Sequence, residues 1–265
     1  MPEGDTIFRA AATLRQTLSQ AVIVNASSRD EHAVPSARLA GQTVTDVEAR
    51  GKHLLIHLAN GDTIHSHMGM TGSWHVYAVG ESWQKPQRQA ALQLETERAV
   101  VVCFSPKQLE VLSKSQLKRH PWIARLGPDI LATTFHMDEA LSRFAAWGHL
   151  PLGEAVLHQG IVCGIGNVYK SEALFIRRLD PFQPVAKLEE SQLRSLLECT
   201  RDLMRRNLNG YPRQTRFRTD GQRKWVYDRS GEPCLVCGTS VAMRRQGDLG
   251  RSTYYCPECQ GTSAG

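Results

Sequence analysis

Four cysteines near the carboxyl end of the sequence have the spacing of a metal site. Cys234 and Cys237 form one C-x2-C pair, and Cys256 and Cys259 form a second pair after 18 intervening residues. Two such pairs can place four thiolates tetrahedrally around one Zn²⁺, whereas redox cysteines would not need two matched pairs. The metal would fold a segment too short to build its own core. We therefore expect one structural Zn²⁺, which is not catalytic because four sulfurs close its coordination shell.

The start of the chain, MPEGDTIFRA, is a second place where residue type and position could do chemistry. If Met1 is removed, Pro2 exposes a secondary amine. An α-amino group has a pKa of about 7.7–8.0, so it is partly neutral near neutral pH and can act as a nucleophile. Such an amine can attack C1′ of a sugar and form a Schiff base, and Glu3 beside it can supply a proton. The alternative is a rigid proline that merely precedes a helix.

The hydrophobic pattern predicts the elements that position these groups. Residues 6–18 have helical spacing, and residues from about 21 to 112 alternate as strands do. The stretch KHLLIHLANGDTIHSH predicts a hairpin with a two-residue turn at Asn60 and Gly61. Further strands are expected in QTVTDVEA, AALQLET and AVVVCF. This part of the chain is therefore expected to be a β-sandwich with a leading helix.

The pattern becomes helical after LGPDI, whose Gly-Pro step marks a break. Helices are expected in DEALSRFAAW before Gly148, around residues 152–160, after Asn167, and in SQLRSLLECTRDLMRRNL before Gly210. We expect an α+β multidomain protein with three parts. They are a β-sandwich over residues 1–125, a helical domain over 130–225 and a cysteine module over 226–261.

Charge and composition restrict the partners. The chain has 265 residues and a net charge of +6, and residues 201–265 hold 12 Lys and Arg against 6 Asp and Glu. A basic region of this kind favours a polyanion, and nucleic acid first. The sequence contains neither an apolar run of about 18 residues that could span a membrane nor a signal peptide. We expect a cytoplasmic protein, or a nuclear one in a eukaryote.

Four separated motifs resemble the formamidopyrimidine-DNA glycosylase/endonuclease VIII family of DNA repair enzymes. They are MPEG, RGKHLL, HQGIVCGIGNVYKSEALF and the terminal C-x2-C…GRSTYYCPECQ. The resemblance covers essentially the whole chain. It implies an N-terminal β-sandwich, a helix–two-turn–helix domain and a zinc finger, with damaged double-stranded DNA bound between them by a monomer. It also implies a bifunctional glycosylase and abasic-site lyase that ends in β,δ-elimination.

The resemblance implies catalytic roles at four positions. Pro2 resembles the Schiff-base nucleophile, and Glu3 resembles the acid that protonates the sugar ring oxygen. Lys52 resembles the lysine that assists base loss and β-elimination. Arg251 resembles the zinc-finger arginine, a phosphate clamp linked to the final elimination, although by itself it could be an ordinary surface arginine.

Three further positions are implied to bind DNA. Asn167 is expected to hold phosphates beside the lesion, and Arg125 matches a DNA-contacting arginine of endonuclease VIII-like members. A damaged base must be flipped out of the duplex, and an apolar side chain fills the gap. HMGMTG offers Met68 and Met70 at the expected hairpin tip, and we favour Met70 as this wedge. The alternative is a core methionine.

The features that separate the two branches of the family are mixed. HMGMTG is similar to the branch that acts on oxidised purines, with Gly69 and Thr71 beside the wedge. In contrast, FSPKQLEVL has Lys107 and Leu109 where that branch has arginine and phenylalanine. QLKRHPWIARLGPDIL is close to endonuclease VIII, and the segment from Gly210 to the cysteines is short. Oxidised pyrimidines are therefore the expected substrates, with oxidised purines as the alternative.

Two positions depart from the family pattern, and the hairpin histidines allow a second interpretation. Asp5 and Thr6 stand where the family usually has proline and glutamate, which affects hydrogen bonding in the lesion pocket. The hairpin histidines could suggest a second metal, but no carboxylate follows at ligand spacing. We interpret them as sheet and DNA-facing residues: His53, His57, His65 and His67. A zinc-containing DNA-binding protein without activity is the remaining alternative function.

Overall fold

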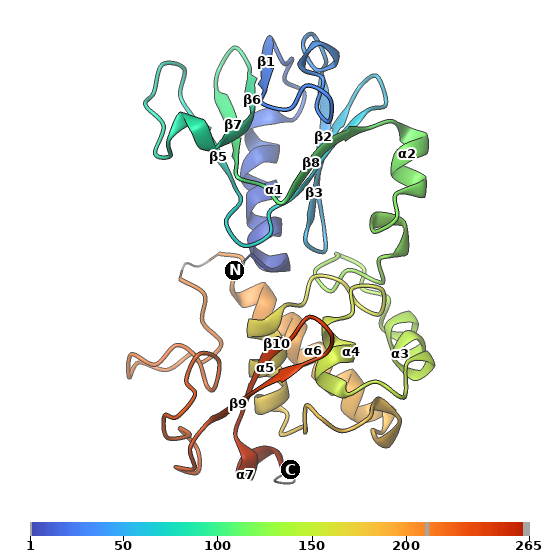
Figure 1. The fold of residues 1–265 in the computed structure, drawn as a ribbon, viewed down its shortest axis with the longest axis vertical. Coiled ribbons are helices and arrows are strands. Elements are labelled where there is room, and N and C mark those ends of the chain that lie inside the picture. The colour runs from blue at the N-terminus through green and yellow to red at the C-terminus, as the bar shows by residue number, and fades with distance from the viewer. Residues whose placement is uncertain (1, 210–211, 262–265) are drawn as a thin grey trace. The chain divides into compact units, whose positions relative to one another are not determined.

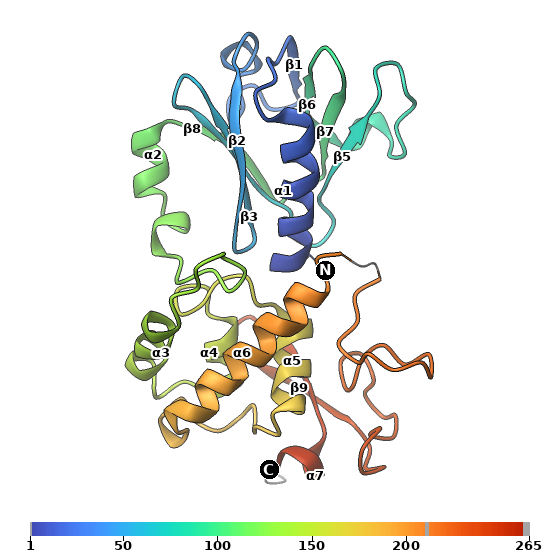
Figure 2. The same ribbon diagram turned by 180° about the vertical axis from the view of Figure 1, so that it is seen from behind.

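The computed structural model describes residues 2–209 and 212–261. It divides into two compact units, one ending at Arg125 and the other beginning at Leu126 (Figures 1 and 2). Within these described residues, no helix combines the length and the apolar character needed to cross a membrane.

The N-terminal unit contains two antiparallel four-stranded sheets, ordered β1-β6-β7-β5 and β2-β3-β4-β8, and one long helix, α1. The first sheet comprises β1 (Asn25–Ser28), β5 (Ser73–Tyr77), β6 (Ala90–Glu95) and β7 (Val100–Phe104). The second comprises β2 (Val44–Arg50), β3 (His53–Leu58), β4 (Thr63–His67) and β8 (Gln108–Leu112). The helical segments are α1 (Gly4–Leu18), η1 (Ser36–Arg38), η2 (Gln87–Gln89), α2 (Lys114–Arg119) and η3 (Ile123–Arg125).

Both sheets and α1 contribute to one apolar core, which confirms the expected β-sandwich with a leading helix. Helical spacing puts Ile7, Ala11, Leu14 and Leu18 on the face of α1 that enters this core. Alternation puts the even-numbered side chains of β3 on the same side, because successive strand residues point to opposite faces. The odd-numbered side chains of β3 point to the other face of the second sheet, where Leu55 packs with residues of α2 and η3.

The hairpin formed by β3 and β4 has the expected strands but a different turn. Leu58 and Asp62 still pair, because the Leu58 N–H donates to the Asp62 carbonyl at 2.9 Å. The loop is therefore three residues, 59–61, and the predicted two-residue turn is wrong. Gly61 adopts a φ of +87°. That left-handed position after a type I turn suits glycine, so Asn60 and Gly61 mark the turn but not its length.

The C-terminal unit begins with helices near the predicted ranges and ends with the cysteine module. Its helical segments are α3 (Met137–Ala146), α4 (Leu152–Leu157), α5 (Asn167–Ile176), η4 (Val185–Lys187), α6 (Glu190–Arg206) and α7 (Pro257–Gln260). The short hairpin consists of β9 (Ala242–Gln246) and β10 (Arg251–Tyr255). The helix around 152–160 ends early at Leu157, and α6 ends at Arg206. The predicted stop at Gly210 lies outside the described residues.

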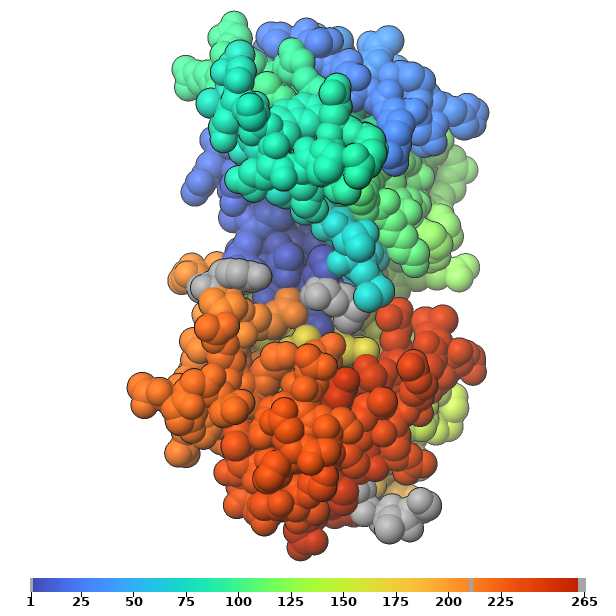
Figure 3. All heavy atoms as spheres, turned by 60° about the vertical axis from the view of Figure 1, so that its left-hand side comes forward, coloured from blue at the N-terminus to red at the C-terminus, as the bar shows by residue number. Residues whose placement is uncertain are grey.

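The segment after α6 has no helix or strand in its described part, residues 212–230. Together with the cysteine module, it covers one face of the C-terminal unit in orange to red (Figure 3). The β9–β10 hairpin packs against α5. The basic last quarter of the chain therefore rests on a helix that is buried along almost its whole length.

Candidate functional site

The first turn of α1 holds two buried carboxylates beside Pro2. Glu3 is the N-cap of α1, and its carbonyl accepts the N–H groups of Thr6 at 2.9 Å and Ile7 at 3.2 Å. The side chains of Glu3 and Asp5 are both fully buried, and Pro2 is half-buried. The N-terminal end of a helix carries partial positive charge, which stabilises carboxylates there. A proton donor or acceptor thus lies next to residue 2, while Met1 is outside the described residues.

Lys52 lies in the two-residue turn between β2 and β3, where Arg50 pairs with His53. Gly51 supplies the positive φ, +59°, that the first position of a type II′ turn requires. The turn leaves Lys52 half-buried at the tip of two strands. A lysine placed in this way is held on a stiff support, unlike one on a long loop.

The two methionines of HMGMTG have opposite environments. Met68 is 3% exposed and belongs to the core of the N-terminal unit, whereas Met70 is 75% exposed. Their loop joins β4 of one sheet to β5 of the other, so the expected hairpin tip is wrong. An exposed methionine on a short crossover between two sheets is available to a partner, as a wedge residue must be.

Three elements bring these residues to one part of the N-terminal unit. The first turn of α1, the β2–β3 turn and the β4–β5 crossover lie at the same end of this unit (Figures 1 and 2). The helix packs on β2, β3 and β5. The sequence positions are far apart, but the fold places an amine, a carboxylate, a lysine and an exposed methionine at one end.

The hairpin histidines differ from the prediction. His53 is 6% exposed and His65 is fully buried, so both lie inside the N-terminal unit and neither presents its side chain at the surface. A carboxylate partner does exist: Glu110 pairs across the sheet from His65, and its Oε1 lies 2.8 Å from His65 Nδ1. His120 Nε2 approaches the same oxygen at 3.1 Å. Spacing within the hairpin could not reveal this carboxylate because it comes from β8.

In the C-terminal unit, α5 and β10 bring Asn167 close to Arg251. Asn167 is the first residue of α5, and its Nδ2 donates to the Ser252 hydroxyl at 3.5 Å. Arg251, the residue before Ser252, is exposed. Lys170 is fully buried and donates from Nζ to the Ser252 carbonyl at 3.0 Å and the Thr253 hydroxyl at 2.7 Å. Lys170 thus holds β10 on α5. The N-terminus of α5, with the exposed Arg251 on the adjacent strand, is suited to bind a phosphate.

Glu172 is a structural anchor that the sequence did not indicate. Its carboxylate is fully buried and accepts the backbone N–H groups of Trp225 at 2.7 Å, Val226 at 2.9 Å and Tyr227 at 2.7 Å. The Thr215 hydroxyl also donates to it. This one side chain therefore ties the irregular segment before the cysteine module to α5. A glutamate in SEALF gives no hint of partners more than 40 positions later.

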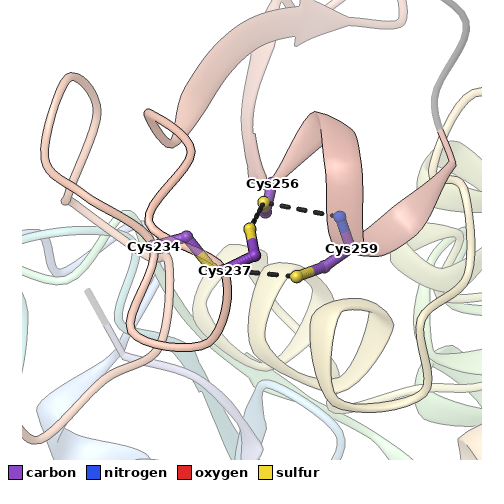
Figure 4. Close-up of side chains that lie close together, drawn as sticks. All are labelled: Cys234, Cys237, Cys256 and Cys259. Atoms are coloured by element: carbon purple, nitrogen blue, oxygen red, sulfur yellow. Dashed lines mark hydrogen bonds between the residues drawn. The ribbon is translucent and has the colours of Figure 1, made fainter.

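The four cysteines form a compact group in the C-terminal unit (Figure 4). Sγ of Cys234 lies 3.9 Å from that of Cys259, and Sγ of Cys237 lies 3.4 Å from that of Cys256. Zn–S bonds of about 2.3 Å in a tetrahedron place sulfurs about 3.8 Å apart, so these distances fit one Zn²⁺. The expected structural zinc is thus supported by the donor set and its geometry.

Arg125, the last residue of η3, is exposed and belongs to the N-terminal unit. The candidate residues therefore fall into two groups. Pro2, Glu3, Lys52 and Met70 belong to elements at one end of the first unit. Asn167 and Arg251 lie together in the second.

Known families and proteins match almost the whole length of this chain. The formamidopyrimidine-DNA glycosylase N-terminal domain matches residues 1–109, the H2TH domain of the same glycosylase matches 126–218, and a zinc finger found in FPG and IleRS matches 231–261. A probable endonuclease 8 2 of Streptomyces coelicolor is 39% identical and covers 98% of this chain and 94% of its own. The DNA-(apurinic or apyrimidinic site) lyase Nei2 of Mycolicibacterium smegmatis is 36% identical, with 99% and 100% covered.

Solved structures share the fold. The crystal structure of MutM (Fpg) from Thermus thermophilus superimposes with a TM-score of 0.81 at 28% identity, covering 99% of this chain and 100% of that one. MutM bound to DNA that contains carbocyclic 8-oxo-G superimposes with a TM-score of 0.82 at 19% identity, covering 98% and 99%.

Proposed function

The chain belongs to the formamidopyrimidine-DNA glycosylase/endonuclease VIII family, and from this premise we propose that it removes oxidised pyrimidines from double-stranded DNA and then cleaves the strand. The relatives named endonuclease 8 and abasic-site lyase support a glycosylase and lyase of base excision repair. Those relatives are bacterial, so we place the protein with the bacterial chromosome in the cytoplasm, acting as a monomer.

The observation that carries the proposal is the fully buried carboxylate of Glu3 directly after Pro2. With Met1 removed, the Pro2 amine attacks C1′, and the electrons of the glycosidic bond leave with the base. The proton of the attacking amine passes to the Glu3 carboxylate, and the departing base takes a proton from water. Glu3 then donates its proton to the ring oxygen O4′ as the C1′–O4′ bond breaks and the sugar opens to an iminium ion. Burial at the N-terminal end of α1 holds this carboxyl in one place.

Strand cleavage follows from the iminium ion. Loss of a proton from C2′ expels the 3′ phosphate, and a second elimination with loss of a proton from C4′ expels the 5′ phosphate. Water then hydrolyses the Schiff base and returns the free amine. We assign Lys52, on its β2–β3 turn, to assist base loss and the first elimination.

The remaining residues hold the DNA. Met70 fills the gap left by the flipped nucleotide, and Arg125 contacts the DNA. Asn167 and Arg251 bind phosphates beside the lesion, and Arg251 assists the final elimination. The zinc keeps the β9–β10 hairpin folded, so it places Arg251 without taking part in the reaction.

The test is covalent trapping of the intermediate. The full protein with Met1 removed is incubated with duplexes that contain thymine glycol, 5-hydroxyuracil, 8-oxoguanine or an abasic site, and borohydride is added. We expect a protein–DNA band with both oxidised pyrimidines and with the abasic site, because reduction fixes the Schiff base. A chain with one extra residue before Pro2 should give no band, because that nitrogen is then in a peptide bond.

Two outcomes would change the proposal. A strong band with 8-oxoguanine and none with the pyrimidines would assign the chain to oxidised purines, as HMGMTG suggests. Tight binding to every duplex without any band would refute the lyase activity and favour a zinc-containing DNA-binding protein.

A further inference from the structure

A buried row of hydrogen-bonded side chains crosses the outer face of the second sheet. His53 Nδ1 lies 2.8 Å from His65 Nε2, and His65 Nδ1 lies 2.8 Å from Glu110 Oε1. His120 Nε2 reaches the same oxygen at 3.1 Å from the segment after α2. The row therefore joins three neighbouring strands, β3, β4 and β8, and the segment that packs on them.

One assignment of protons satisfies every bond in this row. The Ile123 N–H donates to His120 Nδ1 at 3.2 Å, so the proton of a neutral His120 is on Nε2 and is donated to Glu110. A carboxylate only accepts, so His65 donates from Nδ1. His65 Nε2 is then an acceptor, and the His53 Nδ1–H group donates a hydrogen bond to it. All three imidazoles are neutral in this assignment.

A metal ion is the competing interpretation, because His65, Glu110 and His120 offer three ligand atoms within 4.8 Å of one another. Ligation through Nε2 of a neutral His120 would move its proton to Nδ1. That proton would face the Ile123 N–H, and two donors would oppose each other. The hydrogen-bonded row has no such conflict and needs no ion.

The row ends beside two residues of the proposed function. His53 directly follows Lys52 and packs edge-on against His67 at a centroid distance of 5.0 Å. His67 Nδ1 accepts the Gly69 N–H at 3.2 Å, which fixes the start of the loop that carries Met70. Burial and, after it, the neighbouring rings of His65, His67 and His120 lower the pKa of His53 to about 3. Burial and the charges of Lys107 and Lys52 lower the pKa of His67 to about 4. Both rings are neutral at pH 7.

We propose that Glu110, His65 and His53 are positioning residues that hold Lys52 and, through His67, the Met70 loop in their working geometry. None of them touches the reacting atoms. The Glu110 carboxylate orients the His65 ring, and His65 in turn orients the His53 ring. His53 is the first residue of β3, so its position determines where Lys52 projects from the end of the strand. The inference rests on the proposed function for its catalytic consequence, but the hydrogen-bonded row itself can be tested without activity.

The first experiment observes the tautomers by NMR of ¹⁵N-labelled histidine at pH 7, together with the zinc content of the full protein. We expect His53 and His65 protonated on Nδ1, His120 protonated on Nε2, and one Zn²⁺ per chain. A second metal ion per chain that disappears in Glu110→Gln would overturn the proposal in favour of a metal site. Other tautomers would also overturn it.

The second experiment measures single-turnover trapping on abasic-site DNA and the Kd for the same duplex. Glu110→Gln and His53→Leu are expected to slow trapping about tenfold to a hundredfold with Kd changed less than twofold, because misplacement of about 1 Å costs rates of this order. His53→Asn, which keeps a donor near the place of Nδ1, should recover part of the loss. His57→Gln, on the same face of β3 but bonded to Glu48, is the control.

Wild-type rates in Glu110→Gln and His53→Leu would refute the positioning role while leaving the proposed function intact. Absence of trapping by the wild-type protein would instead refute the proposed function. Correct folding of each variant is checked by the NMR spectrum. If Glu110→Gln does not fold, the comparison of His53→Leu with His53→Asn decides the question.

Discussion

Acidification from pH 7 to pH 5 should destabilise the N-terminal unit through His53. Its ring is buried between His65 and His67, and burial lowers its pKa from 6.5 to about 3, with smaller effects from those rings, His120 and Lys52. In the unfolded chain this histidine binds a proton below about pH 6.5. The folded state does not bind it until about pH 3. Stability is therefore complete above pH 6.5 and is lost as the pH falls through this window.

The magnitude follows from the two pKa values. At pH 5 the unfolded state is almost fully protonated at His53 and the folded state is almost unprotonated, which costs about 2 kcal/mol of unfolding free energy. The slope approaches about 1.4 kcal/mol per pH unit, since one pKa unit has that value. His67 acts in the same direction because its pKa is also lowered. The lowered carboxyl pKa values of Asp46 and Glu48 take effect only at more acidic pH.

The assay is native-state hydrogen exchange of the backbone amides of β3 and β4, corrected for the intrinsic effect of pH, because it reports on the N-terminal unit alone. Between pH 7 and pH 5, the unfolding free energy of the wild-type protein should fall by about 2 kcal/mol more than that of His53→Asn, because the asparagine side chain does not titrate. His57→Gln controls for a generic substitution on β3. Equal losses of unfolding free energy in the wild type and His53→Asn would refute the conclusion that His53 is buried and neutral.

Two further predictions concern the C-terminal unit. Removal of zinc by a chelator should unfold the β9–β10 hairpin and weaken DNA binding about tenfold or more, since a hydrogen bond to a charged group contributes about 1.5–3 kcal/mol and Arg251 would lose its support. Fluorescence anisotropy with labelled duplex checks this, and zinc addition should restore binding. Glu172→Ala should lower the unfolding free energy by about 3 kcal/mol or more, because it leaves several backbone N–H groups buried without an acceptor. Urea unfolding measures it, and a change below about 1 kcal/mol would contradict the role of this carboxylate.

Local patterns predicted most of the fold. The spacing of the cysteines predicted the metal site because a short module must bring its own ligands together. The period of α1 and the alternation of β3 predicted which faces enter the core, because burial of apolar side chains selects those faces. The same spacing predicted a helix directly after Pro2 and Glu3, and the resemblance implied their catalytic roles.

The predictions that were wrong, and the contacts that were missed, involve pairing between segments that are distant in the sequence. The acidic partner of His65 is 45 positions away on β8, and no spacing rule within a hairpin reaches it. The β4–β5 crossover could not be told from a hairpin because alternation does not say which sheet a strand joins. Likewise, the contacts of Glu172 form only when residues 215–227 fold over α5.

The anchor provided by Glu172 contacts the main chain and does not depend on side-chain identity. It binds three successive N–H groups, at Trp225, Val226 and Tyr227, so these hydrogen bonds themselves exclude only proline at the three positions. Burial still restricts Val226, which is fully buried in an apolar cluster. The side chains can serve other tasks, as when Trp225 packs on Phe175. The exposed side chains of the segment that enters the zinc finger can therefore change in evolution while the attachment to α5 stays the same.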